Sequence, residues 1–551
     1  MTFVTEDAAH TEGSRLELWR RFCRSRWSAP ELELSLDVSR VRMDQAPDAP
    51  LASALARALA AMAALEGGAL ANADEGRMVG HYWLRAPRLA PSADIRAAVI
   101  EAQADVQTLA GAVRDGRLCG QDGPFRGVIH VGIGGSALGP QLLASALGGQ
   151  DERIRAFFLD NADPDGVASV LRHLPGGLGR TLVSVVSKSG ITPTPHRVLT
   201  EVELAYRQRG LDFARHAVAT TMDGSQLDRY AVGQGWLARL PLWDWVGGRT
   251  SVTSPVGLFP AALLGVDVAA FLDGAAAMDQ LTREPEIARN PAALLAQAWY
   301  VLGEGRGSKN MVMLPYADAL ALLPRYLQQL IMESLGKRLD RREMPVHQGL
   351  TVYGHKGCTD QHSYLQQVRD GRPDCFVTFV RVHRPRHVQP AEPGADPVLA
   401  DHLFGNLEGT RDALLEASRD SVTISIGEVS PRSLGALIAL FERAVGLYAE
   451  LIDVNAYHQP GVDKHAAADV IALQGTALGY LHTAASPKTA EEVAQAIAAP
   501  GRVEMIFTIL EHLAISRARG VRMRNWADPE NTLFWLATGA EPEHDTVHGD
   551  G

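Results

Sequence analysis

The stretch Val128–Gly139, VIHVGIGGSALG, decides the fold class of this chain of 551 residues. An apolar β-type run leads into closely spaced glycines, and a helical pattern, ALGPQLLASAL, follows. A strand, a glycine turn and a helix in this order predict an anion site, because backbone N–H groups at a helix N-terminus are free. The spacing also fits a relaxed dinucleotide fingerprint, with Asp160 after the next apolar run as its ribose acid.

The same alternation of strands and helices continues downstream. The β-type runs are GVIHVGI, IRAFFLD, TLVSVVS and FARHAVAT, then KNMVMLPY, CFVTFVRV and SVTISIGE in a second series that starts near residue 295. This pattern predicts two α/β units, each with a parallel sheet covered by helices on both faces. The predicted divisions are a helical N-terminal region without a convincing strand (1–95), a first α/β domain (96–290), a second (291–500), and a C-terminal helical segment with a polar tail (501–551).

Bulk properties exclude several classes of protein. A formal net charge of −11 argues against nucleic acid or an anionic membrane as a general partner, since these require a broad basic surface. No apolar run has the length of a membrane span or the flanks of a secretory signal. The four cysteines are widely spaced, which favours a reducing cytoplasm.

A loop rich in hydroxyl groups follows the third strand. In SKSGITPT, the hydroxyls of Ser187, Ser189 and Thr192 surround Lys188, ahead of a helix that Thr194 is predicted to cap. Hydroxyls and a helix N-terminus together suit one phosphate monoester, although ordinary turn and cap chemistry uses the same residue types. Two such loops at neighbouring strand ends favour a compact phosphate over a pyrophosphate.

Charged residues with catalytic potential lie further along. Arg249 follows two glycines in DWVGGRTSVTSPVG, and Glu333 is near the end of the predicted helix RYLQQLIMESLGKR, one turn after Gln329. A carboxylate with a raised pKa could act as a general base there, although a surface ion pair and a solvated acid are the simpler alternatives. A metal site formed by His355, Cys358 and His362 would lack a fourth ligand at recognisable spacing. A histidine that acts as an acid or base is therefore the better interpretation of this loop.

These stretches in this order resemble the phosphoglucose isomerase family. The motifs are GIGGSALGP, SKSGITPT, DWVGGRTSVTSPVG, QQLIMESLGK, GCTDQHSYLQQ and NAYHQPGVDK, and the N-terminal LDVSRVRMD resembles the longer bacterial branch. The resemblance implies two sugar-isomerase (SIS) domains of flavodoxin-like topology after a helical N-terminal region. It further implies a homodimer with shared active sites, and reversible isomerisation of D-glucose 6-phosphate and D-fructose 6-phosphate through a cis-enediol(ate), without metal or organic cofactor.

The resemblance also assigns roles to residues. Glu333 matches the base that moves a proton between C2 and C1, and Arg249 matches the arginine that stabilises the intermediate. His362 matches the ring-opening histidine, which the family takes from the partner subunit, and Lys464 matches the lysine of the last motif. The substrate-binding positions are Gly135, Ser136, Ser187, Lys188, Ser189, Thr192, Gln328 and Gln459.

Three departures from the family pattern leave alternatives open. Thr250 stands where an aromatic residue is common, and Cys358 where threonine is frequent. Lys464 comes only two residues after Val462, where the family usually has four, so His465 is an alternative for the lysine role. A sugar-phosphate sensor without catalysis and a dual glucose/mannose phosphate isomerase are the rival functions.

Overall fold

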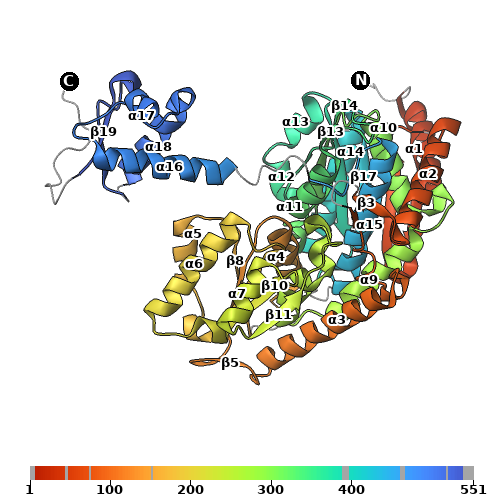
Figure 1. The fold of residues 1–551 in the computed structure, drawn as a ribbon. Coiled ribbons are helices and arrows are strands. Elements are labelled where there is room, and N and C mark those ends of the chain that lie inside the picture. Colours follow the sequence, from red (N-terminus) through yellow and green to blue (C-terminus); the bar gives the residue numbers. More distant parts are fainter. Residues whose placement is uncertain are drawn as a thin grey trace. The chain divides into compact units, whose positions relative to one another are not determined.

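The first parallel sheet is built around the strand that precedes the glycine loop. In the computed structural model its five strands lie in the order β11-β10-β9-β7-β8, which is the flavodoxin-like order (Figure 1). The strands are β7 (Gly127–Val131), β8 (Arg155–Leu159), β9 (Thr181–Val186), β10 (Ala217–Thr221) and β11 (Ala238–Pro241). All neighbouring pairs are parallel. The predicted α/β fold with parallel sheets is therefore confirmed.

Helices cover both faces of this sheet, as its side chains show. Val128 and Leu182 belong to one hydrophobic cluster, whereas the next residues along the same strands, Ile129 and Val183, belong to another. Alternate residues of a strand point to opposite faces, so both faces are buried. The helices that connect the strands are α4 (Gly135–Leu147), α5 (Pro164–Arg172), α6 (Pro193–Gln208) and α7 (Gln226–Gln234).

The second sheet repeats the same order with an N-terminal addition. Its strands lie in the order β1-β2-β17-β16-β12-β15, and the parallel ones are β12 (Asn310–Pro315), β15 (Val352–Tyr353), β16 (Cys375–Val382) and β17 (Ser421–Ile426). At the edge, β2 (Leu34–Arg40) pairs antiparallel with β17, and β1 (Arg26–Ala29) pairs with β2. The N-terminal region is mostly helical, but the expectation that it contains no strand is wrong.

The remaining helices include a long one at the centre. Helix α15 (Pro431–Leu451) packs against α2 (Ala49–Glu66), α9 (Val268–Leu281) and α10 (Pro291–Leu302), and nearly all of its residues are buried. Helices α1 (Asp7–Ser25), α3 (Ala93–Arg114), α8 (Pro255–Leu263) and α14 (Leu399–Glu416) also belong to this part, together with the short helices α11 (Leu323–Leu327), α12 (Gly357–Gln361) and α13 (Leu365–Asp370). Among the described residues, α2 alone has the length and apolar composition of a membrane span, and it buries Leu55, Met62 and Leu65 inside the protein.

The structure describes residues 7–43, 47–72, 76–149, 153–386, 396–459, 466–516 and 519–537. Contacts divide the chain into two compact units, Met1–Gln459 and Pro460–Gly551. The second unit has its own apolar core, formed by α16 (Ala466–Thr483), α17 (Ala490–Ala496), α18 (Val503–Ser516) and the hairpin β18 (Val521–Arg524) with β19 (Leu533–Leu536). The predicted domain boundaries at residues 95, 290 and 500 stay predictions.

Candidate active site

The first glycine loop packs closely against a second one. Gly134 has a positive φ of 57°, and a Cβ atom on Gly135 would lie 2.0 Å from the carbonyl oxygen of Gly248. The Ser251 hydroxyl lies within hydrogen-bond distance of two carbonyl oxygens, those of Gly135 (3.2 Å) and Gly248 (2.7 Å). The start of helix α4, with half-buried Ser136, therefore lies beside the segment that carries Arg249.

Asp160 has a structural partner at the end of β8. Its carboxylate accepts a hydrogen bond of 2.9 Å from the Gln141 amide of α4. The fingerprint reading requires this acid to bind a ribose, whereas here it links a strand end to the neighbouring helix. That Gly135 and Ser136 line a sugar-phosphate pocket stays a prediction.

The hydroxyl-rich loop connects β9 to α6. The Gly190 N–H donates to the Ser187 hydroxyl over 3.1 Å, and Ser189 lies exposed beside it. Helix α6 begins at Pro193, with Thr192 in the capping position and no hydrogen bond from the helix to its hydroxyl. The prediction that Thr194 caps this helix is therefore wrong, because the helix begins two residues earlier, and the Thr192 hydroxyl is not used as a cap.

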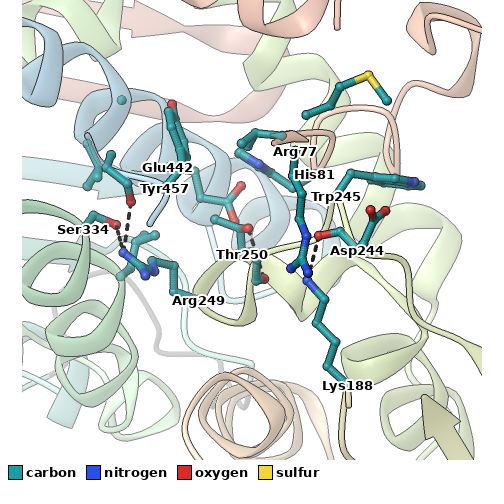
Figure 2. Close-up of a pocket in the computed structure, with 17 residues that line it drawn as sticks. Arg77, His81, Lys188, Asp244, Trp245, Arg249, Thr250, Ser334, Glu442 and Tyr457 are labelled. Carbon is teal, nitrogen blue, oxygen red and sulfur yellow. Dashed lines mark hydrogen bonds between the residues drawn. The ribbon is translucent and has the colours of Figure 1, made fainter. Parts of the chain in front are cut away.

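Lys188 of this loop forms hydrogen bonds with the segment before Arg249. Its ammonium group donates to the carbonyl oxygens of Asp244 (2.7 Å) and Val246 (3.0 Å). Figure 2 shows Lys188 and Asp244 on one side of a pocket that Arg249 lines on the other. The resemblance predicts that Lys188 contacts phosphate, and in the structure it links two loops.

Arg249 is a buried cation with several partners. It is 8% exposed, and its Nε lies 3.3 Å from a carboxylate oxygen of Glu333. Its Nη1 donates to the Ala456 carbonyl (2.9 Å), and its Nη2 to the His458 carbonyl (3.3 Å). Burial lowers the pKa of Arg249, and the charge of Glu333 opposes that effect. The guanidinium plane is thus fixed by the protein before any ligand binds.

Glu333 is held from two sides. Arg249 pairs with one carboxylate oxygen, and the amide of Gln459 donates to the other. Glu333 ends a π-helical segment, Gln328–Glu333, that follows the short helix α11 (Leu323–Leu327), so the predicted single long helix is interrupted. Widened turns of this kind often occur at functional sites. The structure brings three predicted residues together here: Arg249, Glu333 and Gln459.

The two neighbouring glutamines have different surroundings. Gln328 is half-buried at the start of the π-helical segment, and its predicted role in substrate binding stays a prediction. Gln329 lies against the first glycine loop, because a Cβ atom on Gly134 would be 3.0 Å from its amide nitrogen. Gln329 of the predicted helix face therefore approaches the glycine loop.

Among the described residues, no hydrogen bond or ion pair joins the His362 side chain to the partners of Glu333. His362 is exposed at the end of α12 (Gly357–Gln361), a helix that packs against α14. The amide of the preceding residue, Gln361, donates to the Asn406 carbonyl of α14 over 2.9 Å. Lys464 and His465 lie outside the described residues, so the choice between them stays open.

Several residues that line or support this site were not predicted from the sequence. Lys337 is buried four residues after Glu333, and its ammonium donates to the Glu333 carbonyl over 2.7 Å. Burial and the charge of Arg249 lower the pKa of Lys337 to about 8, opposed by Glu333. The pocket of Figure 2 also contains buried His81 and Glu442. Glu442 and Arg443 form a charged pair within the otherwise apolar run ALIALFERAVGL, and charged residues in such a run are seldom buried unless they are paired. This pattern could have indicated Glu442 from the sequence.

Buried charges behind this pocket form one cluster. Arg85 pairs with Asp279 and Glu442, and Arg443 pairs with Asp279 and Glu66. Burial raises the pKa of Glu442 to about 7, while Arg85 opposes that shift. In the described part of the chain, no three His, Cys, Asp or Glu side chains converge as metal ligands would.

Comparisons with known proteins agree with the predicted family. A family model described as phosphoglucose isomerase matches residues 37–392. The chain is 54% identical to a glucose-6-phosphate isomerase of Synechococcus sp. strain JA-3-3Ab, over 94% of this chain and 98% of that protein. It is 52% identical to one of Geobacter sulfurreducens, over 92% and 97%. A crystal structure of a glucose-6-phosphate isomerase from Chlamydia trachomatis, 27% identical, superimposes with a TM-score of 0.73 over 83% of this chain and 91% of that one. The chain belongs to the phosphoglucose isomerase family.

Proposed function

We propose that this protein interconverts D-glucose 6-phosphate and D-fructose 6-phosphate, with Glu333 as the base. The observation that carries the proposal is the contact of the buried Arg249 with the half-buried Glu333 at 3.3 Å, completed by Gln459. Moving a proton between adjacent carbons requires a fixed base and a cation for the negative charge of the enediolate. The relatives are named glucose-6-phosphate isomerases, which gives the aldose substrate, and D-fructose 6-phosphate is the ketose that proton transfer between C2 and C1 would form from it.

In this proposal each group of residues has one role in binding or catalysis. The loop of Ser187, Ser189 and Thr192 binds the phosphate far from the reacting carbons, so its binding energy positions the sugar. Glu333 removes the C2 proton and returns it to C1. Arg249 stabilises the enediolate that forms between these steps. His362, with Lys464 or His465, opens the sugar ring by proton transfer at the ring oxygen and O1.

We also infer a homodimer in which His362 acts in the partner's site. The exposed position of His362 supports this inference, because an exposed side chain is accessible to a second copy of the chain. Beside α12, helix α14 carries Leu399 and Phe404, which are 88% and 52% exposed. Exposed apolar residues on the helix that packs against α12 are typical of a surface that contacts another chain. A cytoplasmic location is part of the same proposal, supported by four free cysteines.

A coupled assay tests the proposed function. Fructose 6-phosphate is supplied in the presence of EDTA, and glucose 6-phosphate is detected through a glucose-6-phosphate dehydrogenase. We expect turnover that EDTA leaves unchanged. No turnover would favour the sugar-phosphate sensor, and loss of turnover in EDTA would indicate a metal requirement. Mannose 6-phosphate is measured in parallel, and comparable rates with both sugars would identify a dual isomerase.

A further inference from the structure

Lys337 is a buried cation next to the base, and its two acceptors are uncharged. The residue is 4% exposed, and its ammonium donates to the carbonyl oxygens of Glu333 (2.7 Å) and His458 (3.3 Å). Burying an ammonium group costs free energy unless the group is paired and hydrogen-bonded, so this position calls for an explanation. The location of the two carbonyl groups that accept from Lys337 indicates the role of this buried charge.

The two carbonyl groups belong to the two segments that hold the carboxylate of Glu333. One segment is the end of the π-helical stretch, which carries Glu333 itself. The other segment is Asn455–Gln459, whose last residue, Gln459, donates to the Glu333 carboxylate. Arg249 binds the second segment as well, at the carbonyl groups of Ala456 and His458. The His458 carbonyl is therefore shared by two cations, directly before the residue that contacts the base.

We propose that Lys337 is a positioning residue, which fixes Asn455–Gln459 against the end of the π-helical segment so that Gln459 and Arg249 hold Glu333 in one orientation. The inference rests on the proposed isomerase function with Glu333 as base. Lys337 acts through backbone carbonyl groups, and the proposal gives it no contact with the sugar. Loss of its ammonium group should therefore slow proton transfer more than it weakens substrate binding.

The charges around Lys337 make its proposed positioning role depend on pH. Arg249 faces it from the neighbouring segment and Glu333 from the preceding turn, and Gln348, its neutral neighbour, pairs with it across the hairpin β13 (Lys337–Leu339) and β14 (Pro345–Gln348). With a pKa near 8, Lys337 is mostly charged at neutral pH and loses its charge as the pH rises above 8. A neutral amine is the weaker donor to a carbonyl group.

The test compares Lys337→Met with Arg338→Met. Arg338 is the next residue of the same strand and is exposed, so its substitution also removes one positive charge but leaves the contacts of Lys337 intact. We expect kcat of Lys337→Met to fall between about ten-fold and a hundred-fold, with KM changed less than about three-fold. The control should keep kcat within about two-fold of that of the unsubstituted protein. Circular dichroism and thermal unfolding establish that each variant is folded.

A pH profile gives a second measurement that does not depend on the Met variant. We expect kcat of the unsubstituted protein to fall above pH 8, and Lys337→Arg to move this fall upward by at least about one pH unit, because arginine stays charged. An unchanged profile in Lys337→Arg, or a folded Lys337→Met with the kcat of its control, would overturn the positioning role. If the unsubstituted protein does not convert fructose 6-phosphate at all, the proposed function fails instead.

Discussion

The carboxylate of Glu333 is held at both oxygens, one by Arg249 and the other by Gln459. Such double anchoring fixes the direction of the lone pairs, which a group that removes a proton from carbon requires. It also keeps the acid close to a buried cation before substrate arrives. A substitution of Glu333 that preserves the shape of its side chain should therefore abolish proton transfer but retain binding of the sugar phosphate.

Substitution of Glu333 by glutamine should abolish isomerisation. An amide of the same shape cannot accept the C2 proton, so we expect kcat to fall by at least about a hundred-fold. A sugar-acid phosphate that mimics the intermediate should still bind, as measured by isothermal titration calorimetry. Glu101→Gln, the same chemical change on the exposed side of α3, is the control. Near-normal turnover in Glu333→Gln would remove this residue from the role of base.

At the residue scale, the order of motifs predicted Arg249, Glu333 and Gln459, which the structure places in contact. Lys337 was not predicted, although it belongs to the motif QQLIMESLGK. Its burial depends on Asn455–Gln459, more than a hundred residues later in the sequence, and a local pattern carries no information about such a contact. Spacing within one motif predicts neighbours on one element, whereas the support for a catalytic group comes from other elements.

At the element scale, two segments differ from the sequence-based expectation for different physical reasons. Strand β2 does carry a signal, since Leu34, Leu36 and Val38 alternate with polar residues. Its polar side is buried as well, because Arg411 of α14 pairs with Asp37. The π-helical segment Gln328–Glu333 carries no such signal, since its side chains also suit an ordinary helix and only the backbone spacing differs.

The centre of α15 permits a stability prediction. The pKa of Glu442 rises from an ordinary value of 4.5 to about 7 on folding, so the folded protein binds more protons than the unfolded chain between these pH values. This residue therefore contributes stability that is present below pH 4.5 and is lost as the pH rises through 7. Glutamine has the same shape and does not titrate.

We expect Glu442→Gln to gain stability relative to the unsubstituted protein as the pH rises from 5 to 8, by on the order of 1–3 kcal/mol. Urea unfolding of both proteins at several pH values measures this difference. Glu201→Gln on the exposed side of α6 should show a flat difference over the same range. A flat difference for Glu442→Gln as well would mean that the carboxyl group titrates alike in the folded and unfolded protein.

At the scale of the whole molecule, we expect the proposed active site to require a residue from a second chain. Arg249 is buried and pairs with the half-buried Glu333, whereas His362 is exposed at the end of α12, a helix that packs against α14. If a second copy supplies its His362, each site of a dimer contains Glu333 from one chain and His362 from the other. Two inactive variants can then restore each other, which a site within one chain cannot do.

Co-expression of Glu333→Gln and His362→Ala with two different affinity tags tests this arrangement. In the mixed dimer, one site carries both substitutions and the other carries neither, so we expect about half of the activity of the unsubstituted dimer. Two-step affinity purification isolates the mixed dimer, and His362→Ala carrying both tags is the control. Mixed dimers with no more activity than either parent would place Glu333 and His362 of one chain in the same site. Light scattering during size-exclusion chromatography checks the assembly, because a dimer has twice the chain mass of 59.3 kDa.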